Sequence, residues 1–427
     1  MPIRIYINPR LACSKILRYV FLVVAENKKF ECQFTGDPAN ADLRIAGGEG
    51  DDFPIAENFY EKILRGETGY QHHFQNECVI IDETGRRDLL STIFYCINSI
   101  QEYNDVSDDV LGRFEFKRSY QDRFGLAGEN IVQRLIDEVC RHPRLTAYSN
   151  HRRRSKIFLS HDIDSIHGAW KEDGFHALKT FQLGKLFSVM LNEALGKPDW
   201  LNMDKIMDIE DDYGFRSVFY WLLYKDKGNS DYTFKSATIQ RSVQHVSERG
   251  WEHGLHKSLG TRKFQEEIRR MGMPIVGNRY HYLNFRVPGG YAEIENAKLK
   301  LDTSLGYYEQ WGFRNSYGLP FMPYDLSGDR VYDFVEVPMQ VMDRTFFSRK
   351  MSVAETLAEL TAWFEKNKND CVFAINFHNN FFSGLKYNGY IELYKSLLGY
   401  FRDSGFEPAT QSGLVNEFYR PEKFIFN

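Results

Sequence analysis

The chain of 427 residues contains few cysteines, and none of them is arranged for metal binding or redox chemistry. The six lie far apart and form no Cys-x-x-Cys pair: Cys13, Cys32, Cys78, Cys96, Cys140 and Cys371. This spacing excludes zinc motifs built from cysteine pairs and thioredoxin-like centres. Scattered thiols are typical of reduced cysteines in a cytoplasmic protein, so we expect a cytoplasmic location.

Long apolar runs and an excess of one charge are also missing. The most apolar stretch, 16–25, contains Arg18 and is too short to span a bilayer. The residues after Met1 lack the pattern of a secretory signal, so we predict no membrane span. The formal net charge is −4, which leaves no basic surface of the kind that nucleic acid requires.

The length and the pattern of the chain predict two domains. Residues 1–150 are expected to form a small α/β domain of unknown role, and residues 151–427 a larger one. In the first, short apolar alternations indicate strands at 4–7, 41–46 and 78–81, and helical periodicity indicates helices at 14–26, 88–103 and 127–141.

After residue 157 the pattern becomes a regular alternation of strands and helices. Strands are expected at 157–162, 217–223, 252–256, 275–283, 334–341 and 371–378. Helices are expected at 175–193, 203–213, 236–248, 262–271, 353–367 and 388–403. This alternation is typical of parallel β/α units, either closed into a barrel or doubly wound.

Two aspartates stand at the end of the first of these strands. In an extended segment 157–164, Ser160, Asp162 and Asp164 point to one face, whereas His161 points to the other. Chemistry in β/α barrels lies at the carboxyl ends of strands, where one aspartate can bind a divalent metal and the other act as a base. The same residues can also serve as a helix N-cap, and the pattern alone leaves both possibilities open.

The segment 160–165 (SHDIDS) resembles the first motif of the NodB-homology polysaccharide deacetylases, carbohydrate esterase family 4-like proteins. The resemblance extends over about 156–418 and implies a distorted (β/α) barrel behind the N-terminal α/β domain. It also implies that Asp162 is the general base and that Asp164 is a metal ligand.

The second family motif is only partly present. In 251–258 (WEHGLHKS) His256 matches the first histidine, but the second histidine's position holds Gly260. In 279–283 (RYHYL) the resemblance implies that Arg279 orients the catalytic aspartate, and His281 shares its face and can take the vacant metal position. A rival for this third motif is 285–288 (FRVP), and His253 is a weaker alternative ligand.

Three further residues follow from the later motifs. Arg314 is expected to pair with Asp162 or to bind substrate, with a surface salt bridge as the alternative. His378 ends a strand whose small and polar residues share its face, and the resemblance implies that it is the general acid. Asp343 is expected to orient that histidine or to close the pocket.

Taken together, the resemblance implies a hydrolase that removes an N-acetyl group from an N-acetylhexosamine of a surface polysaccharide or its precursor. The implied cofactor is a divalent metal, zinc by expectation, bound by Asp164, His256 and His281. The missing histidine at Gly260 keeps a second possibility open, an inactive relative that binds a glycan. A third is an amidohydrolase of the same fold acting on a small amide.

Overall fold

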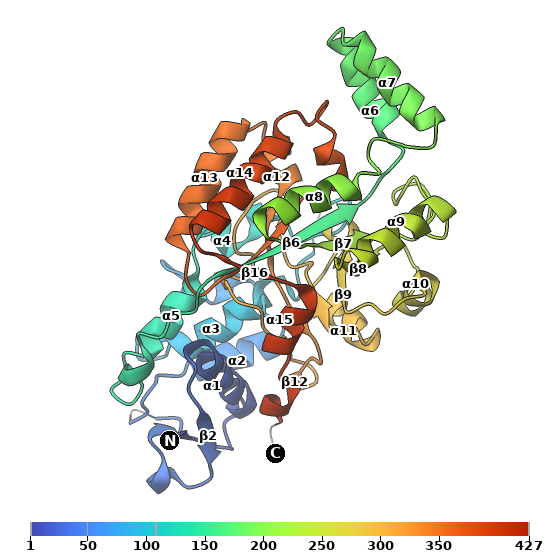
Figure 1. Cartoon of the computed structure of the whole chain (residues 1–427). Coiled ribbons are helices and arrows are strands. Elements are labelled where there is room, and N and C mark those ends of the chain that lie inside the picture. The colour runs from blue at the N-terminus through green and yellow to red at the C-terminus, as the bar shows by residue number, and fades with distance from the viewer. Residues whose placement is uncertain (1, 49, 107–108, 426–427) are drawn as a thin grey trace.

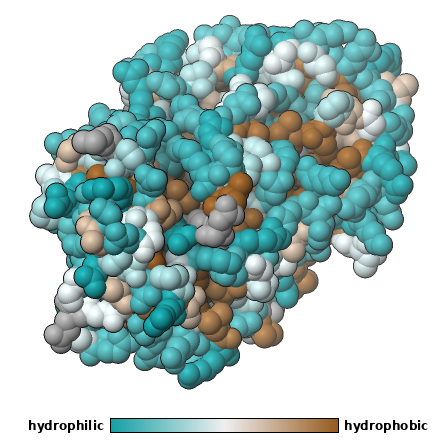
Figure 2. Space-filling model, turned by 90° about the horizontal axis from the view of Figure 1, so that it is seen from below, coloured by the Kyte–Doolittle hydropathy of each residue, from teal (hydrophilic) through white to brown (hydrophobic). Residues whose placement is uncertain are grey.

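The computed structural model describes residues 2–48, 50–106 and 109–425. A large parallel sheet surrounded by helices forms most of the molecule, and a smaller N-terminal sheet lies at the opposite end from the projecting helices α6 and α7 (Figure 1). None of the helices in these ranges is long and apolar enough to cross a membrane. The face seen in Figure 2, which lies at the bottom of Figure 1, is mostly hydrophilic, with hydrophobic residues gathered in patches.

The large sheet has nine strands, which run parallel in every pair that is hydrogen-bonded. Eight follow the order β13-β10-β9-β8-β7-β6-β15-β14, and β16 pairs with β6 beside β7. Their bounds are β6 Lys156–Ile163, β7 Val218–Trp221, β8 Glu252–Lys257, β9 Gly277–Tyr280, β10 Leu301–Asp302, β13 Val335–Glu336, β14 Met339–Met342, β15 Val372–Asn376 and β16 Glu407–Ala409. The strands expected at 157–162, 217–223, 252–256 and 371–378 are therefore present.

The two edges of this sheet are brought together by one short segment. Strands β13 and β14 stand at opposite ends of the strand order, yet only residues 337–338 separate them. The Val337 N–H donates to the Asp302 carbonyl and the Met339 N–H to the Leu305 carbonyl, while Met339 is also in register with β15. The sheet therefore curls into a barrel-like form, as predicted. The single strand expected at 334–341 is two strands, because Pro338 has no N–H to give to a ladder.

Helices cover the outside of the sheet (Figure 1). They are α8 Met203–Tyr213, α9 Ala237–Glu248, α10 Phe264–Met271, α11 Gly289–Asn296, α12 Asp343–Ser348, α13 Val353–Lys366, α14 Tyr390–Asp403 and α15 Gln411–Phe418. Local signals set several ends: Ser352 and Glu355 form a capping box for α13, and Gly214 and Gly272 close α8 and α10 with a positive φ. The helix expected at 175–193 is two helices, α6 Ala169–Lys179 and α7 Leu183–Ala194, because the chain turns at Phe181, where φ is +55°.

The N-terminal segment has its own three-stranded parallel sheet, β2-β1-β3, but packs against the barrel. Its elements are β1 Ile3–Ile7, α1 Ser14–Lys28, β2 Cys32–Thr35, β3 Leu43–Ile45, α2 Glu57–Leu64, the hairpin of β4 Ile80–Ile81 and β5 Arg87–Asp88, α3 Leu89–Ile97, α4 Tyr120–Arg123 and α5 Ile131–Val139. A second hairpin, of β11 Tyr324–Asp325 and β12 Arg330–Val331, lies later in the chain. The Tyr19 hydroxyl donates to the Met322 carbonyl at 3.0 Å, and one continuous buried cluster includes residues of both parts. A division into separate domains at residue 150 stays a prediction.

Two buried carboxyl groups face each other where the barrel closes. Asp302 in β10 and Glu336 in β13 are in register and inaccessible to solvent. Asp302 accepts from the Asn278 amide at 2.8 Å and from the Ser304 N–H at 2.9 Å. Burial raises the pKa of Asp302 to about 6, and burial together with the Asp302 charge raises the pKa of Glu336 well above its usual range.

This pair predicts a pH dependence of stability. A carboxyl with a raised folded-state pKa binds its proton more tightly when folded, so the free energy of unfolding falls as pH rises above about 4 and through the folded value. Glu336→Gln supplies an amide donor to Asp302, and we expect a smaller loss of stability between about pH 5 and pH 8 in urea unfolding. The exposed Glu407→Gln is the control. Equal pH slopes for the wild type and Glu336→Gln would contradict this assignment.

Candidate metal centre

Six of the side chains selected from the sequence meet at the carboxyl ends of neighbouring parallel strands, or in the residues that follow them. Asp162 lies in β6 and Asp164 directly after it, His256 lies in β8, Arg279 lies in β9 and His281 directly after it, and His378 follows β15 by two residues. Carboxyl ends of parallel strands lie at one edge of the sheet, so residues as distant in the sequence as Asp162 and His378 share one site.

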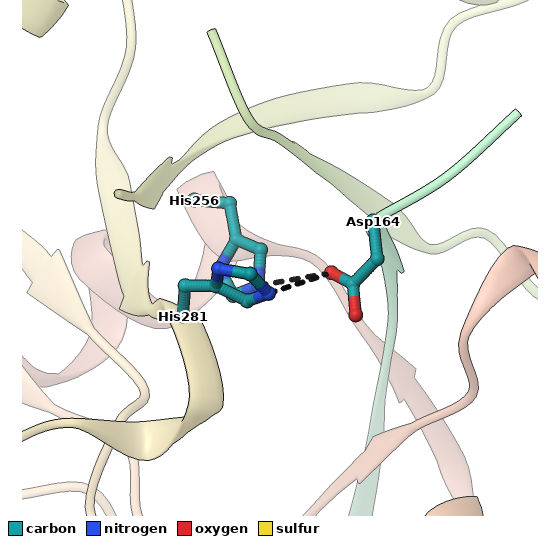
Figure 3. A group of neighbouring side chains, drawn as sticks. All are labelled: Asp164, His256 and His281. Carbon is teal, nitrogen blue, oxygen red and sulfur yellow. Dashed lines mark ion pairs between the residues drawn. The ribbon is translucent and has the colours of Figure 1, made fainter. Parts of the chain in front are cut away.

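Three of these residues have the donor set of a metal site. Asp164 Oδ1 lies 3.4 Å from His256 Nε2 and 3.6 Å from His281 Nε2 (Figure 3). One ligand atom from each of the three lies within 4.8 Å of the others. Asp164 Oδ1 and both ring nitrogens of His281 are buried without a hydrogen-bond partner. Buried polar atoms without partners are costly unless a cation binds them, so these residues fit a divalent metal.

The surroundings shift the two histidines in opposite directions: burial lowers the pKa of His281, whereas for His256 burial is outweighed by the Asp162 and Asp164 charges, which raise the pKa. His256 Nδ1–H donates to the Arg279 carbonyl at 2.8 Å, which leaves the Nε2 lone pair directed toward Asp164. Burial lowers the pKa of His281 although Asp164 opposes the shift, so its ring is uncharged at neutral pH. Burial alone would raise the pKa of Asp164, but His281 and His256 hold it well below its usual range. Neutral imidazole and ionised carboxylate are the forms that bind metal.

Asp162 lies beside this cluster and is fixed at both oxygens. Arg279 Nη1 donates to Asp162 Oδ1 at 2.8 Å, and the Asn376 amide donates to Oδ2 at 2.9 Å. Asp162 Oδ2 is also 3.6 Å from His256 Nε2. Burial acts to raise the pKa of Asp162, but Arg279 and the neighbouring histidines outweigh it and lower the pKa. Asp162 is therefore an ionised carboxylate next to the candidate ligands.

His378 approaches the same space from the opposite side. Its Nδ1–H donates to Asp343 Oδ1 at 2.7 Å, and its backbone N–H donates to Asp343 Oδ2 at 2.6 Å. The other ring nitrogen, Nε2, lies 3.7 Å from Asp164 Oδ2 and 3.9 Å from Asp162 Oδ2. Asp343 thus sets the orientation and tautomer of His378, which is one of the two roles expected for it from the sequence.

The region around Gly260 shows how the missing histidine is accommodated. Gly260 follows β8 in a loop with a φ of +100°, and no atom lies within 4 Å of the position of a Cβ there. This loop lines a cavity of about 360 Å³ that also borders Ser258, His281 and Asn284. His281 reaches the cluster from the end of β9, where the expected strand 275–283 stops at Tyr280.

Two site contacts were not selected from the sequence. Asn376 donates to Asp162, and the Ser160 hydroxyl accepts from Arg279 Nη2 at 2.8 Å. Strand alternation does contain the signal, because Asn376 shares a face with His378 and Ser160 shares a face with Asp162. Neither residue type by itself indicates a catalytic site.

Arg314 is the one predicted site residue that lies elsewhere. Its guanidinium is buried and donates to both carboxylate oxygens of Glu102, at 3.0 and 2.6 Å. The expectation that it pairs with Asp162 is therefore wrong, and so is the alternative of a surface salt bridge. The rival motif arginine, Arg286, donates to the Gly112 carbonyl, and His253 accepts from the Trp221 indole at 3.0 Å.

The protein is similar to known proteins in structure rather than in sequence. No family model matches the sequence, and no curated protein matches it. It is similar to a Mycobacterium smegmatis protein assigned as a polysaccharide deacetylase, with 13% identity and a TM-score of 0.40 over 64% of this chain and 93% of that one.

Two further neighbours are looser. One is a Bordetella bronchiseptica protein assigned as a polysaccharide deacetylase of O-antigen biosynthesis, with 14% identity and a TM-score of 0.32 over 62% of this chain and 89% of that one. The other is a CE4 family pseudoenzyme of Bacillus anthracis, with 10% identity and a TM-score of 0.30 over 63% and 68%.

Several of these neighbours are thus polysaccharide deacetylases, the family that the motifs resemble. At such identities and TM-scores the likeness fixes neither activity nor substrate. The fold and the site themselves define a mixed α/β protein with a curled parallel sheet and a buried Asp-His-His cluster at the carboxyl ends of its strands.

The cluster predicts zinc binding that depends on His281. We expect titration calorimetry of the chelator-treated protein to show one zinc per chain, and His281→Ala to weaken binding on the order of 100-fold or more, because a ligand is lost. His245→Ala removes an exposed histidine far from the cluster and is the control. Unchanged affinity in His281→Ala would remove this histidine from the ligand set.

The Glu102 contact predicts that Arg314 acts on stability. Arg314→Ala leaves a buried carboxylate unpaired, and we expect the free energy of unfolding to fall by about 3–5 kcal/mol. The double variant Arg314→Met with Glu102→Leu removes both charges and should recover most of that loss in urea unfolding. A variant Arg314→Ala of unchanged stability but lost zinc binding would place this residue back at the site.

Proposed function

We propose that the protein is a metal-dependent hydrolase that removes the N-acetyl group from an N-acetylhexosamine of a surface polysaccharide or its precursor. The observation that carries the proposal is the placing of an ionised aspartate and an oriented histidine on either side of a candidate metal cluster. Amide hydrolysis needs a base for water, a charge that stabilises the tetrahedral oxyanion, and an acid for the departing amine. The motif resemblance supports the acetyl-sugar substrate.

Asp164, His256 and His281 would hold the metal. When bound, a divalent ion supplies Lewis acidity, which lowers the pKa of water and polarises an acyl oxygen. Burial keeps His281 neutral, the neighbouring histidines keep Asp164 anionic, and the Arg279 carbonyl binds His256 Nδ1 so that Nε2 faces the cluster. Zinc is the ion that this donor set favours.

Asp162 is the proposed general base. Arg279 occupies Oδ1, and the Asn376 amide binds Oδ2 from the side of β15, so the carboxylate cannot rotate away. The lowered pKa keeps Asp162 ionised at neutral pH and ready to accept a proton from water. Arg279 is a positioning residue, because its contacts are with Asp162, Ser160 and the Thr303 carbonyl.

His378 is the proposed general acid. The Asp343 carboxylate accepts from Nδ1–H, which fixes the ring and aims Nε2 into the site. A proton on Nε2 can then be donated to the leaving nitrogen as the C–N bond breaks, giving acetate and a free amino sugar. The polar cavity beside His281 offers space for the sugar.

Asp162→Asn tests the proposal directly. We expect acetate release from a chitooligosaccharide by the zinc-loaded protein to fall about 100- to 10,000-fold, the usual contribution of a general base, with zinc affinity nearly unchanged. Asp204→Asn, an exposed change, is the control. Full activity in Asp162→Asn would remove this role. If the wild type binds zinc and the oligosaccharide but releases no acetate, the inactive glycan-binding protein becomes the better description.

A further inference from the structure

The helices α6 and α7 form a hairpin that projects from the barrel (Figure 1). Val189 is the only buried residue of α7. Nine of the fifteen large hydrophobic side chains that are exposed in the described ranges lie within residues 170–195. Exposed apolar residues scattered singly are ordinary, but a concentration of this kind marks a surface that contacts another apolar phase.

Exposed apolar residues of α7 form one stripe. Leu183, Phe187 and Met190 follow each other at spacings of four and three, so they lie on one face of the helix. Leu183 is 61% and Phe187 69% exposed, and Phe181, in the turn between the helices, is 88% exposed. An amphipathic helix in a folded protein normally turns such a stripe inward, whereas here it faces solvent.

The base of the hairpin is fixed, so the stripe cannot fold back onto the barrel by a simple rotation. Asp231 accepts from the N–H groups of Ile166 and His167, both at 2.9 Å, at the start of the hairpin. The buried Asp173 of α6 accepts from the Trp200 indole at 2.8 Å, where the chain returns. Asp173 also accepts from the Lys386 N–H at 3.0 Å, after β15, so the base of the hairpin is held against the barrel.

The charge near the turn of the hairpin indicates what covers the stripe. Residues 174–192 contain no Asp or Glu, whereas Lys179 and Lys185 flank the turn at Phe181. A second copy packed turn to turn would bring these lysines close together, which is unfavourable. A bilayer surface with anionic headgroups offers an apolar layer for the stripe and negative charge for the lysines.

We propose that the α6–α7 hairpin docks the protein on an anionic lipid surface, with Phe181, Leu183 and Phe187 inserted among the acyl chains. The hairpin lies on the membrane and does not cross it, in agreement with the lengths of its helices. It begins five residues after Asp164, at the carboxyl end of β6, so docking holds the candidate metal centre on the lipid side of the molecule. This inference does not depend on the proposed hydrolysis.

The test is flotation of the full chain with vesicles, using phosphatidylcholine alone or mixed with phosphatidylglycerol. We expect binding to the anionic vesicles, a loss on the order of 100-fold in Phe181→Ser/Phe187→Ser because two buried rings are removed, and a loss of roughly 30-fold in Lys179→Gln/Lys185→Gln. Leu64→Ser/Ile425→Ser removes two residues of similar exposure, 64% and 68%, outside the hairpin and should bind as the wild type does.

Other outcomes overturn the proposal. No binding to either vesicle, or equal binding by the Phe181→Ser/Phe187→Ser variant, excludes a lipid-docking hairpin. Dimers in light scattering without lipid that the same variant dissociates would show that a second copy covers the stripe. Thermal unfolding of each variant checks folding, and little change is expected because the altered side chains are exposed.

Discussion

The buried guanidinium of Arg279 is the contact on which the architecture of the site depends. Arg279 belongs to β9, donates to Asp162 and Ser160 of β6 and to the Thr303 carbonyl after β10, and lies 4.7 Å above the ring of Tyr220 in β7. It is inaccessible to solvent, so its charge requires a nearby carboxylate. One side chain thereby joins strands across the curl of the sheet and fixes the aspartate beside the metal cluster.

Each carboxylate around that contact has its own set of partners. Asp162 has one oxygen bound by Arg279 and the other by Asn376, whereas the Asp164 oxygen nearest the histidines accepts no hydrogen bond. Asp343 accepts from the Nδ1–H and backbone N–H of His378 and from the Arg344 N–H. Three carboxylates can lie this close together because each contacts a different cation or hydrogen-bond donor. The ligand atoms of Asp164, His256 and His281 lie around one position that a metal ion can occupy.

Closing the barrel also buries ionisable side chains that need nearby partners. The segment 335–342 runs first beside β10 and then beside β15, and buries Glu336 against Asp302 as it does so. The helices then cover the outer face, except for α6 and α7, which leave the body of the protein with their apolar stripe exposed (Figure 1). The candidate site and the start of the hairpin lie at the same end of the barrel, because both follow the carboxyl ends of its parallel strands.

Strand alternation and the order of motifs along the chain determined much of this protein by themselves. Period two separates Asp162 and Asp164, which face the site, from His161, which binds Glu210 of α8 on the outside. The same period puts Asn376 with His378, and the spacing of apolar residues located most helices within a few residues. Such features are local, because the backbone repeats that produce them span only a few positions.

Only the tertiary structure decided the partners of residues far apart in the sequence. Arg314 binds Glu102, 212 positions away, and no local pattern distinguishes that carboxylate from Asp162. The closing of the barrel by two short strands, and the outward stripe of the hairpin expected as one helix, likewise depend on which surfaces meet. Packing decides which distant segments bury and hydrogen-bond to each other, and a pattern of neighbouring residues does not indicate which segments pack together.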